Sequence, residues 1–357
     1  MPEDKPQLDW NRIRSFSQKV SIDLGAAMLA PLSYIGDRLG IFRALAESGP
    51  VTSVELAEKT GLSERYLREW LSAMAAAEYL AYDATSRRFS MPAEHAMVLA
   101  RDESPFFLGG FVQATLPNLS VAPKVMDAFR TGRGVAQTEY PAEVFESMER
   151  MSAGMYRHHL LKRWLPVMPQ VIKSLEDGGS YLDVGCGSGR AAIAIANAFP
   201  KAQVYGYDAH AVSLERARAN AKAAGLADRI HFEVVDGTRL PASKFDFIST
   251  FDVVHDSVDP PALLRSIRAA LRPGGSYLMV EVNVSSKVED NIGPMGRMMY
   301  SMSTLYCMSV SLGGGGMGIG ACMGEEKARE LCLGAGFTQF RRLPVDDLFS
   351  ILYEVRA

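Results

Sequence analysis

The chain has 357 residues, of which 48% are hydrophobic and 22% are charged, the balance of an ordinary globular protein. A length well above roughly 200 residues predicts more than one domain. The 38 Lys and Arg residues are balanced by 41 Asp and Glu residues, so the net charge is −3. This excludes the strongly basic composition that is typical of proteins living on nucleic acid or anionic lipid.

The cysteines and the uncharged segments indicate where the protein works. No two of the four cysteines form a C-x-x-C pair, and residues 1–5 lack the apolar core of a signal peptide. We therefore predict a cytoplasmic protein with reduced thiols. Residues 104–123 and 298–324 carry no charge, but prolines break the first segment and four consecutive glycines break the second. We expect both to line a pocket and expect no membrane partner.

The first 100 residues have the pattern of a winged helix, in which a helix-turn-helix is followed by a hairpin. An apolar helix is expected over residues 24–47. Ser53 and Ser63 are expected to cap two shorter helices, over 53–59 and 63–79. Short strands around Tyr82 and Phe89 complete the pattern.

From residue 101 to 175 the pattern stays helical, and afterwards strands and helices alternate. The expected strands cover residues 180–184, 203–207, 230–235, 245–250, 277–282, 337–343 and 349–355. The expected helices between them cover residues 190–198, 211–224, 262–271 and 325–333. Repeated βα units predict an α/β, Rossmann-like domain in which helices cover both faces of a parallel sheet.

A glycine-rich loop connects the first strand of this domain to its first helix. It contains Asp183, Gly185, Gly187 and Gly189. Glycines at this position let backbone N–H groups approach a ligand at the crevice where such sheets bind ligands. The loop also fits the dinucleotide pattern G-x-G-x-x-A, so an NAD-dependent oxidoreductase stays an alternative at this point.

Acidic residues end the next two strands of the domain. Asp208 comes 19 residues after Gly189, where a carboxylate can accept both ribose hydroxyls of a nucleoside. His210 follows closely and is expected to border the same ligand. Asp236 and Gly237 end the third strand, where an acid or its neighbouring backbone can meet an adenine edge.

Together with residues 271–275, Leu-Arg-Pro-Gly-Gly, these segments resemble the successive motifs of class I S-adenosylmethionine-dependent methyltransferases. The resemblance covers residues 180–357 and implies a seven-stranded sheet whose last strand is antiparallel. Residues 208–210, 251–256, 280–281 and 303–307 resemble a bacterial subgroup with an N-terminal winged helix, whose members are labelled both methyltransferase and regulator. The winged helix is also similar to the dimerisation domain of plant small-molecule O-methyltransferases, which implies a homodimer formed through the N-terminal region.

The resemblance implies S-adenosyl-L-methionine as cofactor and gives each motif a role. Asp183 is expected to hold the methionine end, Asp208 the ribose and Asp236 the adenine. The residues expected to contact the cofactor are Asp183, Gly185, Gly187, Gly189, Asp208, His210, Asp236, Gly237 and Phe251. The implied division is a winged-helix and dimerisation domain over 1–100, a helical pocket-capping region over 101–175 and a class I methyltransferase domain over 176–357.

His255 is the candidate general base of this reaction. It follows the fourth strand at the carboxyl edge of the sheet, and an unperturbed pKa of ~6.5 suits a base at neutral pH. In the O-methyltransferases that the chain resembles, a His-Asp pair supplies the base, and His255-Asp256 matches that pair. Ser257 and Val258 replace the aromatic residues that follow it there, which leaves the phenolic substrate class open. A helix cap or packing against the cofactor is the alternative for His255.

Two further groups of residues have less specific patterns. The methionine-rich segment 295–323, with Cys307 and Cys322, suits either a soft metal or the flexible apolar wall of a pocket. Because it lacks a compact ligand cluster, we favour the wall and predict no metal. His158 and His159 are adjacent on an expected helix, so they point in different directions. We expect them to pack or to face solvent, and the alternative is that one of them faces the cofactor.

These inferences predict an S-adenosylmethionine-dependent methyltransferase that acts on a small, partly apolar acceptor by in-line transfer. An S-adenosylmethionine-sensing transcriptional regulator is the other alternative beside the oxidoreductase. Residues 53–90 carry five basic and six acidic side chains, a net charge of −1. A recognition helix needs cations for the phosphates, so we do not expect DNA to be a partner.

Overall fold

The computed structural model describes residues 8–357. Residues 1–5, for which we expect no signal peptide, lie outside the described part. The chain divides after Leu116 into two compact units. The helical segment expected over 101–175 is shared between them.

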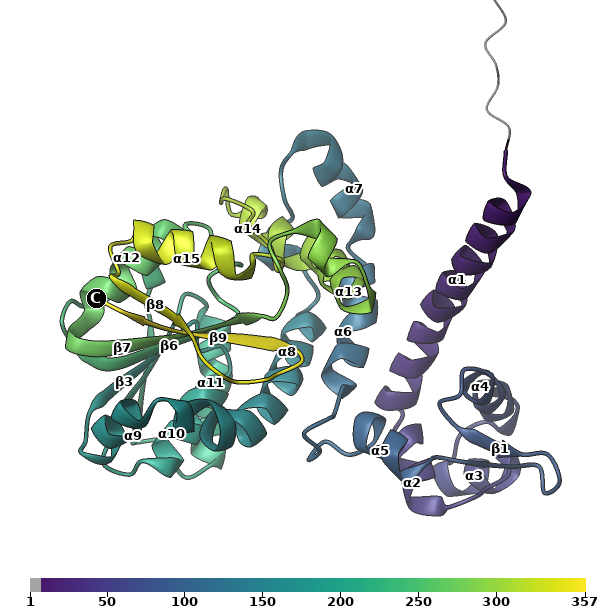
Figure 1. Ribbon diagram of the computed structural model, residues 1–357. Helices are drawn as coiled ribbons and strands as arrows, with labels where there is room; N and C mark the ends of the chain where they lie inside the picture. Colours follow the sequence, from purple (N-terminus) through teal and green to yellow (C-terminus); the bar gives the residue numbers. More distant parts are fainter. Residues whose placement is uncertain (1–7) are drawn as a thin grey trace, which may run out of the picture. The chain divides into compact units, whose positions relative to one another are not determined.

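The first unit is the predicted winged helix (Figure 1). Its elements are α1 Trp10–Arg38, α2 Ile41–Ser48, α3 Ser53–Thr60, α4 Glu64–Ala76, β1 Ala81–Asp83, β2 Arg88–Ser90 and α5 Ala93–Leu99. The single helix expected over 24–47 was wrong. Gly40 has a φ of 70°, a left-handed conformation that separates α1 from α2.

The two shorter helices are capped differently from the expectation. The N-cap of α3 is Thr52 and not Ser53: the Thr52 hydroxyl accepts from the N–H of Glu55 (3.2 Å), and the Glu55 carboxylate accepts from the N–H of Thr52 (2.8 Å). This reciprocal pair is a capping box. Ser63 does stand at the N-cap of α4, but its side chain makes no capping hydrogen bond.

The second unit begins with helices. The structure has α6 Gly109–Leu119 across the division, then α7 Ala122–Thr131, η1 Gln137–Glu139, α8 Ala142–Met155, the π-helix η2 Tyr156–Trp164, η3 Leu165–Val167 and α9 Pro169–Glu176. The predicted helical character of this region is therefore confirmed.

A seven-stranded sheet follows, as predicted. Its strands are β3 Ser180–Val184, β4 Gln203–Asp208, β5 Ile230–Val234, β6 Phe245–Phe251, β7 Leu271–Val282, β8 Gln339–Arg342 and β9 Ser350–Arg356. The spatial order is β5-β4-β3-β6-β7-β9-β8, and β9 is antiparallel to both of its neighbours. The strand order reverses between β3 and β6, and ligands bind outside the carboxyl ends of strands at such a point.

Helices cover both faces of the sheet (Figure 1). On one face lie α9, α10 (Arg190–Ala198) and α11 (Ala211–Ala223), and on the other lie α12 (Pro260–Ala270) and α15 (Gly324–Gly334). Each face has its own apolar core, which fixes the strand ends on which candidate site residues lie.

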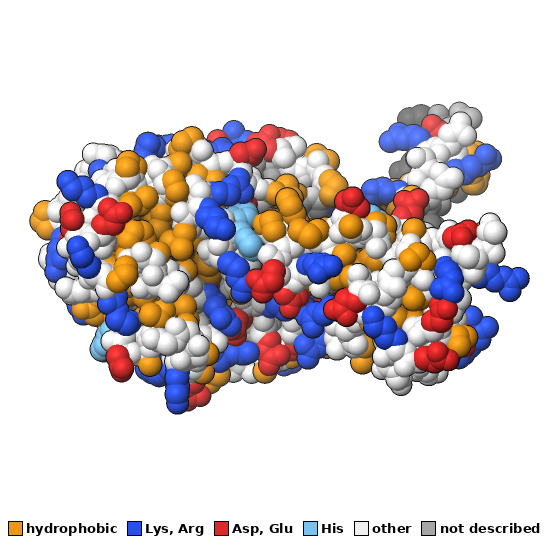
Figure 2. All heavy atoms as spheres, turned by 90° about the horizontal axis from the view of Figure 1, so that it is seen from below, with side chains coloured by type: hydrophobic (Ala, Val, Ile, Leu, Met, Phe, Trp, Pro, Cys, Tyr) orange, Lys and Arg blue, Asp and Glu red, His pale blue; other side chains and the backbone are white. Residues whose placement is uncertain are grey.

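The uncharged segment 298–324 folds into short helices instead of one long one. These are α13 Pro294–Met302, the π-helix η6 Ser303–Cys307 and α14 Met308–Gly313, preceded by η5 Val288–Asn291. Among residues 8–357, no helix combines the length and the apolar character needed to cross a membrane. On the face drawn in Figure 2, Lys and Arg side chains are intermingled with Asp and Glu, and hydrophobic side chains gather over part of the surface.

Candidate active site

The glycine-rich loop joins β3 to α10 at the carboxyl edge of the sheet. Gly185, Gly187 and Gly189 have φ values of 69°, 52° and 75°, which disfavour any side chain. A Cβ on Gly185 would lie 2.7 Å from Val253 Cγ2, and one on Gly189 would lie 2.8 Å from Phe232 Cζ. A Cβ on Gly187 would meet nothing within 4 Å. Two of the glycines thus permit close packing, and the third leaves open space beside the backbone.

Asp183 lies on β3 next to this loop and is 2% exposed. Burial and the nearby Asp208 raise its pKa well above the ordinary value, although hydrogen bonds from the Ala192 N–H and the Ser249 hydroxyl act in the opposite direction. Its Oδ1 atom has no hydrogen-bond partner among the described residues. A buried polar atom without a partner calls for an explanation, and a ligand that donates a hydrogen bond would supply it.

Asp208 is the last residue of β4 and faces the same loop. Its Oδ2 accepts from the N–H of Gly187 (2.9 Å) and its Oδ1 accepts from the N–H of His210 (2.8 Å). A carboxylate has about four acceptor positions, so two backbone bonds leave room for further donors. His210 is exposed at the N-cap of α11.

The Asp236 carboxylate is hydrogen-bonded to a neighbour in its own turn. Its Oδ1 accepts from both the N–H and the hydroxyl of Thr238 (2.9 Å each) and caps the 3₁₀ turn η4, Gly237–Arg239. These bonds lower the pKa of the exposed Asp236 carboxyl. A Cβ on Gly237 would lie 2.7 Å from Leu263 Cδ1, so the backbone is closely packed there. Contact between Asp236 and an adenine stays a prediction.

Phe251 ends β6 and forms an aromatic group with the π-helix η2. Its ring lies 4.8 Å from that of Tyr156 in an edge-on arrangement and 6.1 Å from that of Trp164 in a stacked one. Burial raises the pKa of Tyr156 well above its ordinary value, and the charges of Asp183 and Asp252 raise it further. Tyr156 therefore lies close to the Asp183 side of the site. This placement was not predictable from the sequence, because it depends on how η2 packs on the sheet.

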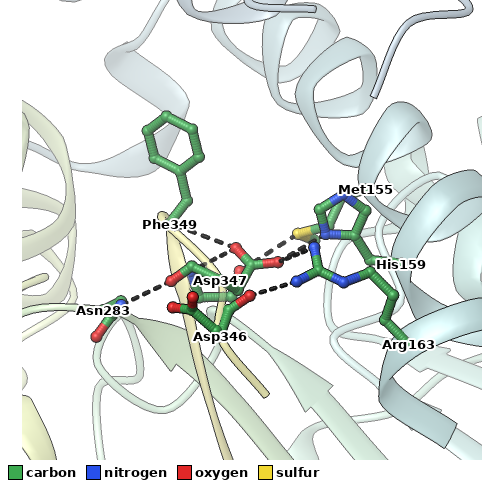
Figure 3. Close-up of polar contacts among 8 residues, drawn as sticks. Met155, His159, Arg163, Asn283, Asp346, Asp347 and Phe349 are labelled. Carbon is green, nitrogen blue, oxygen red and sulfur yellow. Dashed lines mark hydrogen bonds and ion pairs between the residues drawn. The ribbon is translucent and has the colours of Figure 1, made fainter. Parts of the chain in front are cut away.

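The other side of η2 is tied to the loop between β8 and β9 (Figure 3). His159 Nδ1 lies 2.6 Å from Asp347 Oδ2, and Arg163 Nη1 lies 3.6 Å from the same oxygen. The second oxygen of Asp347 accepts from the N–H of Phe349 (3.1 Å), and the Asp347 carbonyl accepts from Asn283 (2.7 Å). His159, expected to pack or to face solvent, is thus one half of an ion pair that fixes η2.

His255 lies in the loop after β6 and is 2% exposed. Its Nδ1 is hydrogen-bonded to the carboxylate of Glu281, a residue of β7 that is itself 3% exposed and also accepts from the N–H of Val254 (3.2 Å). Its Nε2 lies 3.2 Å from Asp256 Oδ1. The predicted neighbours His255 and Asp256 do meet, but the residue that holds the ring is Glu281. The sequence feature that could have indicated this role is that Glu281 is the one acid in the otherwise apolar expected strand 277–282.

The charges around His255 set its protonation. Burial alone would lower the pKa of His255, but Asp256 and Glu281 outweigh it and raise that pKa well above 6.5. Asp252 has a left-handed φ of 56° and is exposed, and its carboxylate lies close to His255 and Glu281. Desolvation of this carboxylate and the charges of Glu281 and Asp256 raise its pKa to about 7, against the opposing effect of His255. Cys307 of η6 is hydrogen-bonded to the His255 ring.

Two family models match the chain. Residues 27–101 match an Rv2258c-like winged HTH domain, and residues 175–331 match a methyltransferase domain. The second unit contains a class I methyltransferase domain. Both the resemblance and the fold class inferred from the sequence are therefore confirmed.

A curated relative and two solved structures extend the likeness over most or all of the chain. Acetylserotonin O-methyltransferase of Mus musculus is 28% identical over 88% of this chain and 82% of its own. Mitomycin 7-O-methyltransferase MmcR has the same fold, with a TM-score of 0.70, 21% identity and coverage of 97% of this chain and 100% of its own. Human N-acetylserotonin methyltransferase in complex with SAM gives a TM-score of 0.67 at 19% identity, over 100% of this chain and 99% of its own.

Other curated relatives match the methyltransferase over a shorter length. The match covers 23% of a Synechococcus protein, 41% of methyltransferase GfsG of Streptomyces halstedii and 38% of 27-O-demethylrifamycin SV methyltransferase of Amycolatopsis mediterranei. The chain thus spans less than half the length of these relatives.

Proposed function

We propose that the protein is an S-adenosylmethionine-dependent methyltransferase that methylates a small, partly apolar molecule. One juxtaposition carries the proposal. The neighbouring strands β3 and β6 end at the same edge of the sheet, the first in an open glycine loop beside the unpartnered Asp183 oxygen, the second in the buried His255. A candidate ligand site and a candidate base at one edge are what group transfer to a bound acceptor needs.

The residues of the loop fit the proposed cofactor. S-adenosylmethionine supplies a methyl group on a sulfonium, which a nucleophile displaces in line. Asp183 Oδ1 has a free acceptor position for the methionine ammonium, and Gly187 has open space beside its backbone. Asp208 retains acceptor positions for ribose hydroxyls. Gly185 and Gly189 would let the backbone of the loop approach the cofactor closely. On the adenosine side we expect contacts with His210, Asp236 and Gly237. The rings of Phe251 and Tyr156 would form an aromatic wall of the cofactor site.

His255 is the proposed base for an acceptor hydroxyl. Its Nδ1 is engaged by Glu281, which fixes the orientation of the ring, and Nε2, beside Asp256 Oδ1, is the nitrogen that would take the proton. Glu281 also stabilises the imidazolium that forms, as a buried carboxylate does behind other catalytic histidines. O-methylation follows from this assignment, and the names of the mouse relative and of MmcR point the same way.

Calorimetry of the full chain against S-adenosylmethionine and against NAD⁺ and NADH tests the cofactor. We expect one site for S-adenosylmethionine and no heat with the nicotinamides. Binding of a nicotinamide alone would replace this proposal by the oxidoreductase that the glycine loop also permits.

The regulator is the less favoured function because of the charges on α4. Arg65 pairs with Glu69 (2.6 Å) and Arg68 with Glu64 (3.3 Å), so these cations are already neutralised by acids on the same helix. DNA phosphates need free Lys and Arg side chains. A gel shift with sequence-specific affinity that falls steeply with salt would favour the regulator instead.

We also infer a homodimer formed through α1. Apolar side chains along this helix are 62% to 73% exposed, namely Trp10, Phe16, Ile22, Leu24 and Met28. An apolar surface of this extent on one element marks an interaction site, and the resemblance of the winged helix to a dimerisation domain makes a second copy the partner we propose. A cytoplasmic location stays a prediction.

A further inference from the structure

We propose that His255, Asp256 and Cys307 bind one thiophilic divalent cation such as Zn²⁺. The bound cation would inhibit methyl transfer by occupying the proposed base. One ring nitrogen, one carboxylate oxygen and the thiol sulfur of these three residues lie within 4.8 Å of one another. They come from the loop after β6 and from the π-helix η6, far apart in the sequence. The binding itself goes beyond the proposed function, whereas the inhibition rests on the proposed role of His255.

The spacing of the three atoms is close to that of a metal site. With bonds of roughly 2.0–2.3 Å, the ligand atoms of a tetrahedral zinc site lie about 3.3–3.8 Å apart. His255 Nε2 and Asp256 Oδ1 are already 3.2 Å apart. Closing the remaining separations to Cys307 requires a side-chain shift of about an ångström, estimated from the same bond lengths.

The surroundings prepare these atoms for a cation. Glu281 accepts from Nδ1 of His255, which presents Nε2 to the site in the manner of the carboxylate–histidine–metal arrangement. Asp256 Oδ1 is buried and lies 3.2 Å from His255 Nε2, with no well-directed hydrogen bond among the described residues. Cys307 is 9% exposed. A buried carboxylate oxygen beside a buried thiol and imidazole is the polar surface that a cation would satisfy.

The chemistry of the three ligands selects the cation. A thiolate and a carboxylate balance the two charges of the ion, and the protons of the Cys307 thiol and of His255 Nε2 leave to solvent on binding. One sulfur, one nitrogen and one oxygen ligand favour Zn²⁺, Co²⁺ or Cd²⁺ over Mg²⁺ and Ca²⁺. Asp252, His255 and Glu281 also lie close together, but that set would need the ring nitrogen that Glu281 already holds.

A cation on Nε2 removes the lone pair that the proposed base uses. Zinc should therefore inhibit methyl transfer, and a chelator should restore it. This revises the expectation that the cysteine-containing segment 295–323 takes part in no metal site, since Cys307 joins His255 only once the chain is folded.

Cobalt absorption of the chelator-treated full chain tests the site without methyl donor or acceptor. We expect one equivalent of Co²⁺ to give a near-ultraviolet thiolate charge-transfer band and visible bands of tetrahedral cobalt, all removed by Zn²⁺. Cys307→Ser should abolish the thiolate band and weaken binding about 10–100-fold. Cys332→Ala, which removes a buried thiol elsewhere, should leave the spectrum unchanged.

A second variant keeps the test decisive if Cys307→Ser does not fold, as judged by its melting temperature. Asp256→Asn keeps the shape of the side chain and should also weaken Co²⁺ binding. Absence of the thiolate band in the wild-type chain, or its survival in Cys307→Ser, overturns the proposal. Because the readout is metal binding, a protein that proves not to be a methyltransferase would leave the cobalt result intact.

Discussion

At the residue scale, the pKa of His255 depends on two buried or half-buried carboxylates. Asp256 and Glu281 raise this pKa, and Asp252 and Cys307 are the other titratable groups close to the ring. A base works only when it has lost its proton, so kcat/KM should rise with pH through a value above 6.5. The raised pKa favours the protonated ring in the resting site.

Glu281→Gln tests this arrangement. Removing the negative charge should lower the pKa of His255 and move the rising limb of the pH profile of kcat/KM to lower pH. The maximal rate should fall about 10–100-fold, because the ring loses its orientation and its counter-charge. A limb at unchanged pH would show that another group, such as Asp252, governs the rate.

Asp208 and Asp236 offer a matched comparison at the cofactor site. Asp208 is 8% exposed and faces the glycine loop, whereas the Asp236 carboxylate is taken up by Thr238. Asp208→Asn should weaken S-adenosylmethionine binding by roughly tenfold or more, because a charged acceptor contributes about 1.5–3 kcal/mol. Asp236→Asn should weaken it less, since asparagine also caps a helical turn. Calorimetric Kd values for the two variants measure the difference. Equal losses of affinity would mean that Asp236 also contacts the cofactor, as predicted for the adenine.

At the scale of elements, η2 is positioned by a single buried carboxylate. Burial would raise the pKa of Asp347, but hydrogen bonds from His159 and from the backbone N–H groups of Phe349 and Ser350 lower it below 3.8. A depressed carboxyl pKa stabilises the fold above the unfolded value and loses that stabilisation as pH falls toward the folded value. The contribution is therefore present at neutral pH and disappears below about pH 4.

Asp347→Asn should remove this stabilisation. We expect the variant to lose about 1–3 kcal/mol at pH 7 and to lose less at pH 3, where the wild-type pair is itself being broken. Melting temperatures across this pH range measure the effect, and a loss independent of pH would contradict it. Since η2 also carries Tyr156 next to Phe251, weaker cofactor binding should accompany the loss of stability.

The elements themselves were largely predictable from the sequence, for local reasons. The strands were predictable from apolar runs separated by glycine and proline. The parallel sheet was predictable from the alternation of strands and helices. The helix break at Gly40 was missed because it depends on the conformation of a single residue. The N-cap at Thr52 was missed because either of two adjacent hydroxyls could have reached the N–H group. The partners of His255 and His159 escaped because they lie 26 and 188 residues away in the chain.

At the scale of the whole molecule, the exposed apolar side chains of α1 predict the oligomeric state. Light scattering during gel filtration should give twice the mass of the chain. Phe16→Glu combined with Met28→Glu should give a monomer, because two charges in an apolar interface remain unpaired. The matched control is Phe129→Glu, an exposed aromatic position of α7 in the other unit, which should stay dimeric. A wild-type monomer would contradict the inference.

The central claim is that this site transfers a methyl group with His255 as the base. The most direct measurement incubates the wild-type chain and His255→Gln with methyl-labelled S-adenosylmethionine and fractions of a metabolite extract, and follows the labelled product by mass. We expect a labelled small molecule with the wild-type chain and a rate lower by about 10²–10⁴-fold with the variant, at equal cofactor affinity. An equal rate in both proteins, or no labelled product in any fraction, would contradict it.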